Sequence, residues 1–355
     1  MSIESNRAEQ SEMTVAQAWE YWLSYRRGEV RDITWKSYEQ VSLYVVGPLL
    51  VGTKVERYRF ARYGELPTHA QMLDMLGSIP ISKLTTAQIR LWHKTLTTFV
   101  SVNSANIAKK FLRAALCLAA EDFALAVPPM PSRMGRGRPR PKKRILAPEQ
   151  VGRLLRAALE DERGIYYAFP FLTGVRPGEQ LALTWDDIDL AHDLISIRRS
   201  QQPNGYVTDL TKTAAGMRDV PISPLLHAFL VNWQAQCPRF GTRQDPVFPA
   251  FGRQKHKSYL RRGVPLRYNN FLYTYWRPAL ARLQLPRVTP HSARHAFIST
   301  MQAQGVEVGL VAKLVGHANA TITLEHYTQA VRGGDAAVLA LEAAYRPPLL
   351  EGISR

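Results

Sequence analysis

The chain has 355 residues, of which 46% are hydrophobic, which is enough to bury the cores of two ordinary domains. Lysine and arginine number 46 against 29 aspartates and glutamates, giving a formal net charge of +17. This composition excludes a disordered tail and favours a nucleic-acid partner, because each cation set against a phosphate releases condensed counterions. A generally basic protein and a protein that binds an anionic membrane surface are the alternatives.

Neither a membrane segment nor a metal site is visible in the sequence. No apolar run approaches the roughly 20 residues that span a bilayer, and residues 1–13 are a polar lead without an apolar signal segment. We therefore expect a cytoplasmic protein that makes no membrane contact. Cys117 and Cys237 form no CxxC pair, so both are predicted to be reduced thiols. No cluster of zinc ligands is present, and we expect no cofactor.

Residues 14–126 are predicted to form a mostly helical domain. Thr14 is a suitable N-cap for a first helix, and further helices are expected to begin near Thr34, at Thr85 or Thr86, and at Ser104. The apolar face of the first helix consists of Ala16, Trp19, Trp22 and Leu23. Residues 51–76 show no clear period and are rich in basic and aromatic residues. They are interpreted as a loop, either inserted over DNA or simply solvated.

The segment 127–148 is predicted to be an extended basic linker. It opens with Val-Pro-Pro-Met-Pro, which cannot continue a helix. Its centre holds seven basic residues: Arg133, Arg136, Arg138, Arg140, Lys142, Lys143 and Arg144. An extended basic chain suits contact with a phosphate backbone, so these side chains are predicted to bind DNA. A solvated run of charges is the alternative.

Residues 149–332 are predicted to form the second domain. Helices are expected over 149–160 and 164–173, and Gly174 separates the second of these from a short helix that begins at Pro177. Turn residues then separate three strand-like runs, which predicts a small antiparallel sheet from Leu194–Arg198, Tyr206–Leu210 and Arg218–Ile222. Helices follow from Pro224, and residues 333–355 hold a last helix at about 335–345 and a tail. The predicted fold class is mainly α with a small antiparallel β-sheet (α+β).

An arginine after a glycine is the first candidate for phosphate chemistry. Arg176 lies in the run TGVRPGE between Gly174 and Gly178, which permit a tight turn and the close approach of a ligand. Its planar guanidinium can donate paired hydrogen bonds to a phosphate, and Glu179 lies one turn away, where it could orient the arginine. Taken alone, such an arginine is more often an ordinary surface residue.

Four further elements of a phosphoryl-transfer site follow along the chain. Lys212 lies at a predicted hairpin turn, where a lysine can protonate a leaving oxygen. His291 and Arg294 are three positions apart in HSARH and share a face of a predicted helix, whereas His295 points elsewhere and is expected to be structural. His317 follows a glycine. The phenol of Tyr327 attacks only if a nearby base and cations stabilise its phenolate. Each of these signals is weak by itself.

Together these residues resemble the tyrosine recombinase (phage integrase) family. The runs TGVRPGE, HSARHAFIST and LVGHANATITLEHYTQ are similar to the three sequence boxes of that family. The resemblance covers about residues 147–332, whereas residues 14–126 resemble the family's helical core-binding domain only in pattern. The six residues that match the family's catalytic set in order are Arg176, Lys212, His291, Arg294, His317 and Tyr327.

The resemblance implies a role for each of these residues. Tyr327 attacks the scissile phosphate and forms a 3′-phosphotyrosine, which leaves a 5′-hydroxyl. The two arginines bind the phosphate with His317. Lys212 is the acid for the leaving oxygen, and His291 is the base for Tyr327 or its positioner. The covalent bond conserves the energy of the phosphodiester, so neither ATP nor a metal is implied.

The resemblance also implies double-stranded DNA as substrate, with the two domains closing around the duplex. The family usually acts as a homotetramer that exchanges C-terminal segments, and the helix at 335–345 could supply that contact or pack on its own domain. A second basic stretch, 253–267, could add contacts to the DNA backbone. Only about 13 residues precede the first helical domain, too few for an arm-binding domain, and this favours simple exchange at core sites.

Four other functions are the alternatives to this interpretation of the sequence. A type IB topoisomerase-like enzyme shares much of this chemistry but relaxes single duplexes. A recombinase similar to the Xer proteins would resolve DNA rather than integrate a mobile element. A DNA-binding relative without catalytic activity is opposed by the intact set of six residues. A metal-dependent hydrolase lacks a carboxylate cluster near the histidines.

Overall fold

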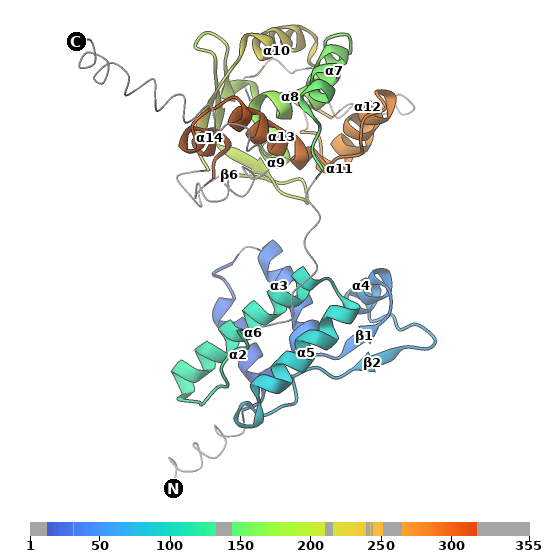
Figure 1. The fold of residues 1–355 in the computed structure, drawn as a ribbon, viewed down its shortest axis with the longest axis vertical. Coiled ribbons are helices and arrows are strands. Elements are labelled where there is room, and N and C mark those ends of the chain that lie inside the picture. Colours follow the sequence, from blue (N-terminus) through green and yellow to red (C-terminus); the bar gives the residue numbers. More distant parts are fainter. Residues whose placement is uncertain are drawn as a thin grey trace, which may run out of the picture. The chain divides into compact units, whose positions relative to one another are not determined.

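The computed structural model describes residues 13–30, 32–132, 144–209, 216–238, 242, 244–250 and 265–317. The chain divides into two compact units, Met1–Arg140 and Pro141–Arg355 (Figure 1). The boundary between them falls inside the segment 127–148 that the sequence predicts to be a linker. None of the described helices combines the length and the apolar character that crossing a bilayer requires.

In the described residues of the N-terminal unit, four helices of twelve or more residues stand out, and hydroxyl side chains fix where three of them begin. They are α2 (Val15–Arg26), α3 (Asp32–Val45), α5 (Thr86–Phe99) and α6 (Val102–Phe123). Thr14 and Thr85 form capping boxes with Gln17 and Gln88, as a helix start of this composition favours. The prediction that Ser104 caps the last helix is wrong. Ser101 caps it, because its hydroxyl accepts the backbone N–H of Ser104.

The core of this unit combines small residues on α6 with large aromatic residues on its neighbours. The buried face of α6 is largely alanine at spacings of three and four, which lets α2 pack closely against it. Trp22 lies between Trp19 and Tyr38, with ring centroids 5.2 and 4.8 Å away, and Phe111 meets Tyr38 edge to face. Cys117 is exposed on α6, and both cysteines are free thiols.

Residues 51–76 are not the loop that the sequence predicts. Strand β1 (Leu49–Val51) pairs antiparallel with β2 (Gln71–Leu73), and helix α4 (Lys54–Tyr63) lies between them in the chain. Thr53 and Glu56 form a capping box at the start of α4, and Gly64 ends the helix in the left-handed conformation. The pair of strands and α4 lie together at one edge of the unit (Figure 1). A 3₁₀ turn, η1 (Ile81–Lys83), precedes α5.

Helices also dominate the second unit. The central helix is α8 (Ile165–Thr173), which is almost entirely buried and packs against α7 (Pro148–Leu159), α10 (Pro224–Gln236) and α13 (Pro290–Ala303). Tyr166 on α8 stacks on Tyr275 with centroids 4.2 Å apart. The remaining helical elements are α9 (Pro177–Gln180), η2 (Trp185–Asp187), α11 (Tyr268–Phe271), the π-helical turn η4 (Leu272–Trp276), α12 (Arg277–Arg282) and α14 (Val308–Val315).

Among the residues of this unit that the structure describes, the strands form two small antiparallel sheets rather than one. Strand β4 (Leu194–Ile197) lies between β3 (Ile188–Asp189) and β7 (Arg218–Pro221). Strand β6 (Val207–Asp209) pairs instead with β5 (Arg199–Gln201), so the second of the three predicted runs leaves the sheet of the other two. The predicted class, mainly helical with small antiparallel strands, is confirmed.

Candidate active site

The turn after α8 brings Arg176 to the edge of the second unit's core. Gly174 ends α8 with φ +64°, a left-handed conformation that favours glycine. A Cβ at Gly174 would also lie 2.5 Å from the ring of Phe297 on α13, so the two helices approach closely because this position is glycine. Gly178 makes a similar close approach to the backbone of Gln201 in β5. From the sequence, this glycine was instead predicted to allow a ligand to approach.

Glu179 holds Arg176 from two sides. Its carboxylate accepts the backbone N–H of Arg176 at 2.8 Å and the Nη1 of the same residue at 2.6 Å. The carboxylate is 1% exposed, whereas about two fifths of the Arg176 side chain is exposed. The guanidinium is thus held firmly at one edge while the rest of it faces solvent. The contact between Glu179 and Arg176 is present, and the orienting role that the sequence analysis gives to Glu179 stays a prediction.

Arg218 is a third member of this cluster that the sequence analysis did not single out. It lies at the start of β7, and its Nη2 donates to the second oxygen of Glu179 at 2.7 Å. It is nearly as buried as Glu179. The residue stands in the run MRDVPIS, six positions after Lys212, and an arginine at the start of a predicted strand was the available signal. Its partner Glu179 is 39 residues away, so no local pattern could reveal the pairing.

Both arginines also bind the end of α14. Arg176 donates Nη2 to the carbonyl of Gly316 at 3.0 Å, and Arg218 donates Nε to the carbonyl of Leu314 at 2.6 Å. These are carbonyls at a helix C-terminus, which lack partners within the helix and carry partial negative charge. Through its two arginine partners, Glu179 therefore links three segments of the chain: the turn after α8, strand β7 and the end of α14.

Arg294 is the most deeply buried cation of the site. It lies on α13, is 1% exposed, and donates Nη1 to the carbonyl of Gly174 at 3.0 Å. Its Nη2 is buried and has no hydrogen-bond partner within the described structure. A buried guanidinium nitrogen that lacks a partner is costly in free energy, which marks a place prepared for an acceptor such as a phosphate oxygen.

The cluster carries a net positive charge. Burial is the main factor that lowers the pKa of Arg294, to about 9, and the like charge of Arg176 adds to it, while Glu179 opposes the shift. Burial also opposes ionisation of Glu179. The hydrogen bond and charge of Arg218, with the charge of Arg176, outweigh that effect and lower the pKa of Glu179. Three guanidinium groups thus surround a single carboxylate, and an anion would relieve the excess positive charge.

The two candidate histidines lie on elements that carry the arginine cluster. His291 is exposed in the first turn of α13, one turn before Arg294, and its ring meets that of the buried His295 edge to face at 5.0 Å. His317 directly follows Gly316, whose carbonyl binds Arg176, and its backbone N–H donates to Ala312 at 2.9 Å. Glycine at 316 supports this turn, because it adopts φ +69° after α14.

Comparison with known proteins gives the same assignment as the residues. A family model described as the phage integrase family matches residues 144–332, which is more than half of the chain. The chain belongs to the phage integrase family. An integrase/recombinase of Escherichia coli is 28% identical over 223 residues, covering 57% of this chain and 65% of that protein. The ICEBs1 integrase of Bacillus subtilis is 26% identical over 53% of this chain and 51% of its own length. The chain thus spans about half to two thirds of these relatives.

Nearly the whole chain aligns with solved structures of the same fold. The Tn1549 transposon integrase, solved in complex with transposon right end DNA, aligns with a TM-score of 0.66 at 20% identity over 94% of this chain and 99% of that one. A lambda integrase tetramer bound to a Holliday junction aligns with a TM-score of 0.56 at 15% identity over 92% and 82%. At these identities the likeness establishes the fold of this integrase-family chain.

Part of the predicted site lies outside the described residues. This holds for Lys212, Tyr327, the helix at 335–345, most of the stretch 253–267, and six of the seven basic linker residues, from Arg133 to Lys143. Arg144 is exposed just before α7. Within the described part of this integrase-family chain, no group of three or more His, Cys, Asp or Glu side chains is arranged to hold a metal ion. The structure thus joins Arg176, Glu179 and Arg294, adds Arg218, and leaves the roles of the six predicted catalytic residues as predictions.

Proposed function

We propose that this chain is a site-specific DNA recombinase that cleaves and rejoins duplex DNA through a 3′-phosphotyrosine at Tyr327. The observation that carries the proposal is the cluster of Arg176, Arg218 and Arg294 around the buried carboxylate of Glu179. It offers an unpartnered Nη2 on Arg294 beside a half-exposed Arg176 that Glu179 holds in place. Donors fixed before the substrate arrives can stabilise negative charge that grows in a transition state without reorganising.

The chemistry follows from assigning the six residues their family roles. The phenolate oxygen of Tyr327 attacks phosphorus, a new P–O bond forms, and the bond to the 5′-oxygen breaks. The Tyr327 proton passes to His291, while Lys212 gives a proton to the leaving 5′-oxygen. Arg176, Arg294 and His317 bind the non-bridging oxygens. One phosphate ester replaces another, so the energy of the bond is retained, and we propose that neither ATP nor a metal ion takes part.

We also propose that the reaction integrates or excises a mobile element. The printed names of relatives support this choice over a resolution system similar to the Xer proteins, since they include the ICEBs1 integrase and a transposase from transposon Tn916. The working form would be a homotetramer on double-stranded DNA in the cytoplasm, with the helix at 335–345 exchanged between subunits. The lambda integrase tetramer on a Holliday junction supports such an assembly by analogy of fold.

The organisation into domains is proposed from the sequence with the same boundaries. Residues 14–126 would bind DNA, 127–148 would form the basic linker and 149–332 would hold the catalytic centre, with 1–13 and 333–355 as terminal segments. The division of the chain into units at residues 140 and 141 supports a boundary within the linker.

A nicked suicide substrate tests the proposal. Such a duplex loses a short strand after cleavage, so the covalent adduct accumulates and migrates slowly in a denaturing gel. We expect an adduct with the unmodified chain and none with Tyr327→Phe. Tyr206→Phe is the matched control, since Tyr206 is 73% exposed on the second unit, and it should form the adduct at the normal rate. An adduct that survives Tyr327→Phe, or no adduct from the unmodified chain on its own recombination site, would refute the proposal.

A further inference from the structure

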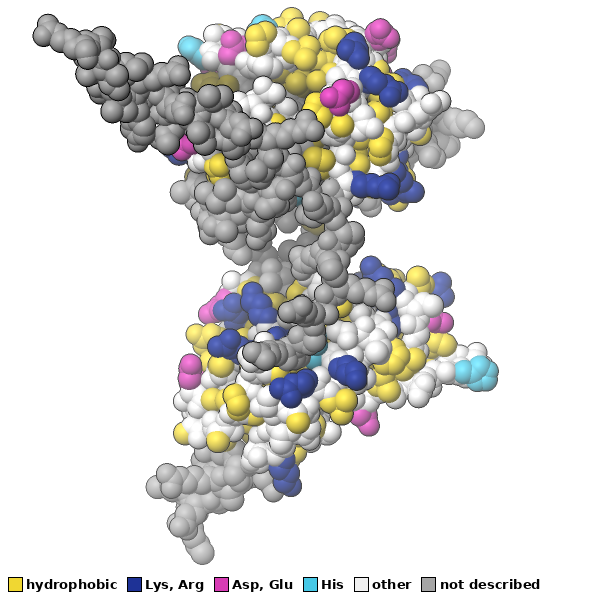
Figure 2. All heavy atoms as spheres, in the orientation of Figure 1, with side chains coloured by type: hydrophobic (Ala, Val, Ile, Leu, Met, Phe, Trp, Pro, Cys, Tyr) yellow, Lys and Arg dark blue, Asp and Glu magenta, His cyan; other side chains and the backbone are white. Residues whose placement is uncertain are grey.

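Arg218 is an enclosed cation that the proposed phosphoryl transfer does not use. Lysine and arginine side chains are scattered over the surface of both units, as the dark blue groups in Figure 2 show. The side chain of Arg218, at the start of β7, is instead only 7% exposed. An arginine is costly to withdraw from water unless hydrogen bonds satisfy its charged group. The partners of Arg218 therefore indicate what it does.

Each of the three guanidinium nitrogens of Arg218 donates to a protein oxygen. Nη2 donates to the carboxylate of Glu179 at 2.7 Å, Nε to the carbonyl of Leu314 at 2.6 Å, and Nη1 to the carbonyl of Gly216 at 3.1 Å. The planar group holds its donors in fixed directions, so one side chain sets the relative places of three segments. With every nitrogen engaged and little of the side chain exposed, Arg218 is poorly placed to bind a phosphate itself.

The bond to Leu314 holds the last turn of α14, which His317 follows. The carbonyl of Gly316, two residues after Leu314, binds Arg176. Val315 lies between these two residues and is buried in a small core with side chains of α13. The N–H groups of Gly316 and His317 donate to carbonyls of α14 at 3.1 and 2.9 Å. Hydrogen bonds therefore fix both the carbonyls and the N–H groups of this turn, and two of these bonds come from arginines.

The bond to Glu179 extends the influence of Arg218 to Arg176. The carboxylate oxygen that accepts Nη2 of Arg218 also accepts the backbone N–H of Arg176, and the other oxygen accepts Nη1 of Arg176. Glu179 is 1% exposed, so water cannot replace a lost donor without rearrangement. Arg218 thus contacts the residue that holds Arg176 and the turn that precedes His317.

We propose that Arg218 is a positioning residue, which sets Arg176 and His317 at the separation that lets both bind one phosphate. The inference rests on the proposed function for the phosphate, but it gives a role to a residue outside the six of the family set. Arg218 transfers no proton and touches no substrate. Its effect falls on the rate of cleavage, because donors fixed in advance matter most where negative charge grows.

The kinetic test is a double-mutant cycle on strand cleavage at saturating DNA. Arg218→Gln should slow formation of the adduct about tenfold in the otherwise unmodified chain. In a chain that already carries His317→Ala, the same substitution should slow it less than about threefold, because one of the two groups that Arg218 positions is gone. Arg282→Gln is the control. It removes another arginine–carboxylate pair of the second unit, with Asp161, and its small effect should be the same with and without His317.

A second measurement does not depend on cleavage. Backbone hydrogen exchange in the DNA-free chain reports how firmly the last turn of α14 is held. Arg218→Gln should speed exchange of the N–H groups of Gly316 and His317 about tenfold, because it releases the carbonyl of Leu314. Arg282→Gln should leave both N–H groups unchanged. Unaltered protection of α10 in the two variants would show that each remains folded.

Arg218→Lys covers the case in which Arg218→Gln fails to fold. Lysine keeps a positive charge beside Glu179, but its single nitrogen cannot serve three acceptors that lie in different directions. This variant should remain folded and cleave about threefold more slowly, and the loss should disappear when His317 is replaced.

The outcomes separate this inference from the proposed function. Faster exchange at the end of α14, together with a loss of rate that depends on His317, supports the positioning role. Unchanged exchange, or equal losses of rate with and without His317, overturns it while the recombinase function stands on the adduct. If the unmodified chain forms no adduct, the proposed function fails, and the exchange measurement alone supports or overturns the hold of Arg218 on α14.

Discussion

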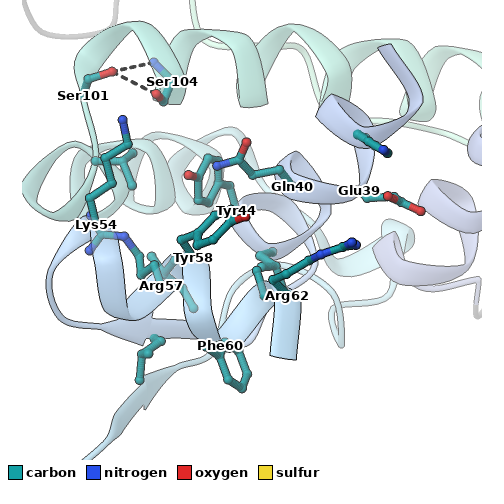
Figure 3. A pocket seen from close by; sticks show the side chains of 16 residues that line it. Glu39, Gln40, Tyr44, Lys54, Arg57, Tyr58, Phe60, Arg62, Ser101 and Ser104 are labelled. Carbon is teal, nitrogen blue, oxygen red and sulfur yellow. Dashed lines mark hydrogen bonds between the residues drawn. The ribbon is translucent and has the colours of Figure 1, made fainter. Parts of the chain in front are cut away.

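Basic residues gather in two places in this molecule, and the two differ in almost every physical respect. In the second unit, Arg294 is buried, the side chain of Arg218 is 7% exposed, and Arg176 is held by Glu179 and by the carbonyl of Gly316. A groove of the N-terminal unit is lined by α3, α4 and the start of α6 (Figure 3). Its cations Lys36, Lys54 and Arg62 are exposed, whereas Arg57 is partly buried and donates to the carbonyl of Gly52. The first arrangement fixes its donors through several hydrogen bonds, whereas the second keeps long side chains free to follow a flexible polyanion.

The difference indicates whether each group of cations contributes to the rate of the reaction or to the affinity for DNA. Burying Arg294 with an unpartnered nitrogen costs folding free energy, and that cost is recovered when a charged oxygen arrives. Such a site suits a transition state, in which negative charge is largest. Exposed cations gain little from one another and release counterions on binding, so they contribute affinity rather than rate.

The largest expected effect separates rate from affinity. Arg294→Gln or Arg176→Gln should slow strand cleavage by a factor of about 10² to 10³, because each removes a fixed donor to the phosphate. The dissociation constant for duplex DNA should change by only a few fold. Rapid-quench measurement of the adduct at saturating DNA checks this, with Arg62→Gln as the control that should cleave at the normal rate. Equal losses of rate in Arg294→Gln and Arg62→Gln would erase the distinction between the two regions.

A smaller effect is expected from Arg218, which acts through its neighbours. Arg218→Gln should slow cleavage about tenfold, since a charge-assisted hydrogen bond contributes about 1.5–3 kcal/mol and part of its loss falls on folding stability. Arg218→Lys should restore part of the rate. The control is Arg282→Gln, which breaks the pair with Asp161 and makes no hydrogen bond or ion pair with Arg218 among the described residues. If Arg218→Gln keeps the normal rate at saturating DNA while only its stability falls, Arg218 is structural and does not position the site.

The smallest expected effect is a shift in acid stability. The pKa of Glu179 is lowered, so its contribution to stability is complete above the unfolded-state value of about 4.3 and is lost as the pH falls through the folded-state value. Arg218→Gln removes a main source of that lowering. The midpoint of acid unfolding, followed by circular dichroism, should therefore move to higher pH in this variant. Arg62→Gln, in the exposed groove, should leave the midpoint unchanged, and identical transitions in all three chains would contradict the role given to the ion pair.

The sequence by itself determined the local features of this protein. Threonine caps with glutamine three residues later mark where α2 and α5 begin, and Gly174 and Gly316 mark where α8 and α14 end. These depend on neighbours within one helical turn, so they can be read along the chain. For the same reason, the sequence could predict that Arg294 and His291 share one face of a helix. Helix α4 also has a capping box and a terminal glycine, but its many basic and aromatic residues hide the periodic pattern of apolar residues that predicts a helix.

Only the tertiary structure decided which distant groups share a charge. Arg218 reaches Glu179 across 39 residues and Leu314 across 96, and β6 joins β5 rather than the strands on either side of it in the prediction. Likewise, the groove exists because α4 lies near α3 and the start of α6. Hydrogen bonds and ion pairs act over a few ångströms in space and are indifferent to separation along the chain. A pattern read in sequence order therefore finds the helices, the boxes and Glu179, but not the distant arginine that pairs with Glu179.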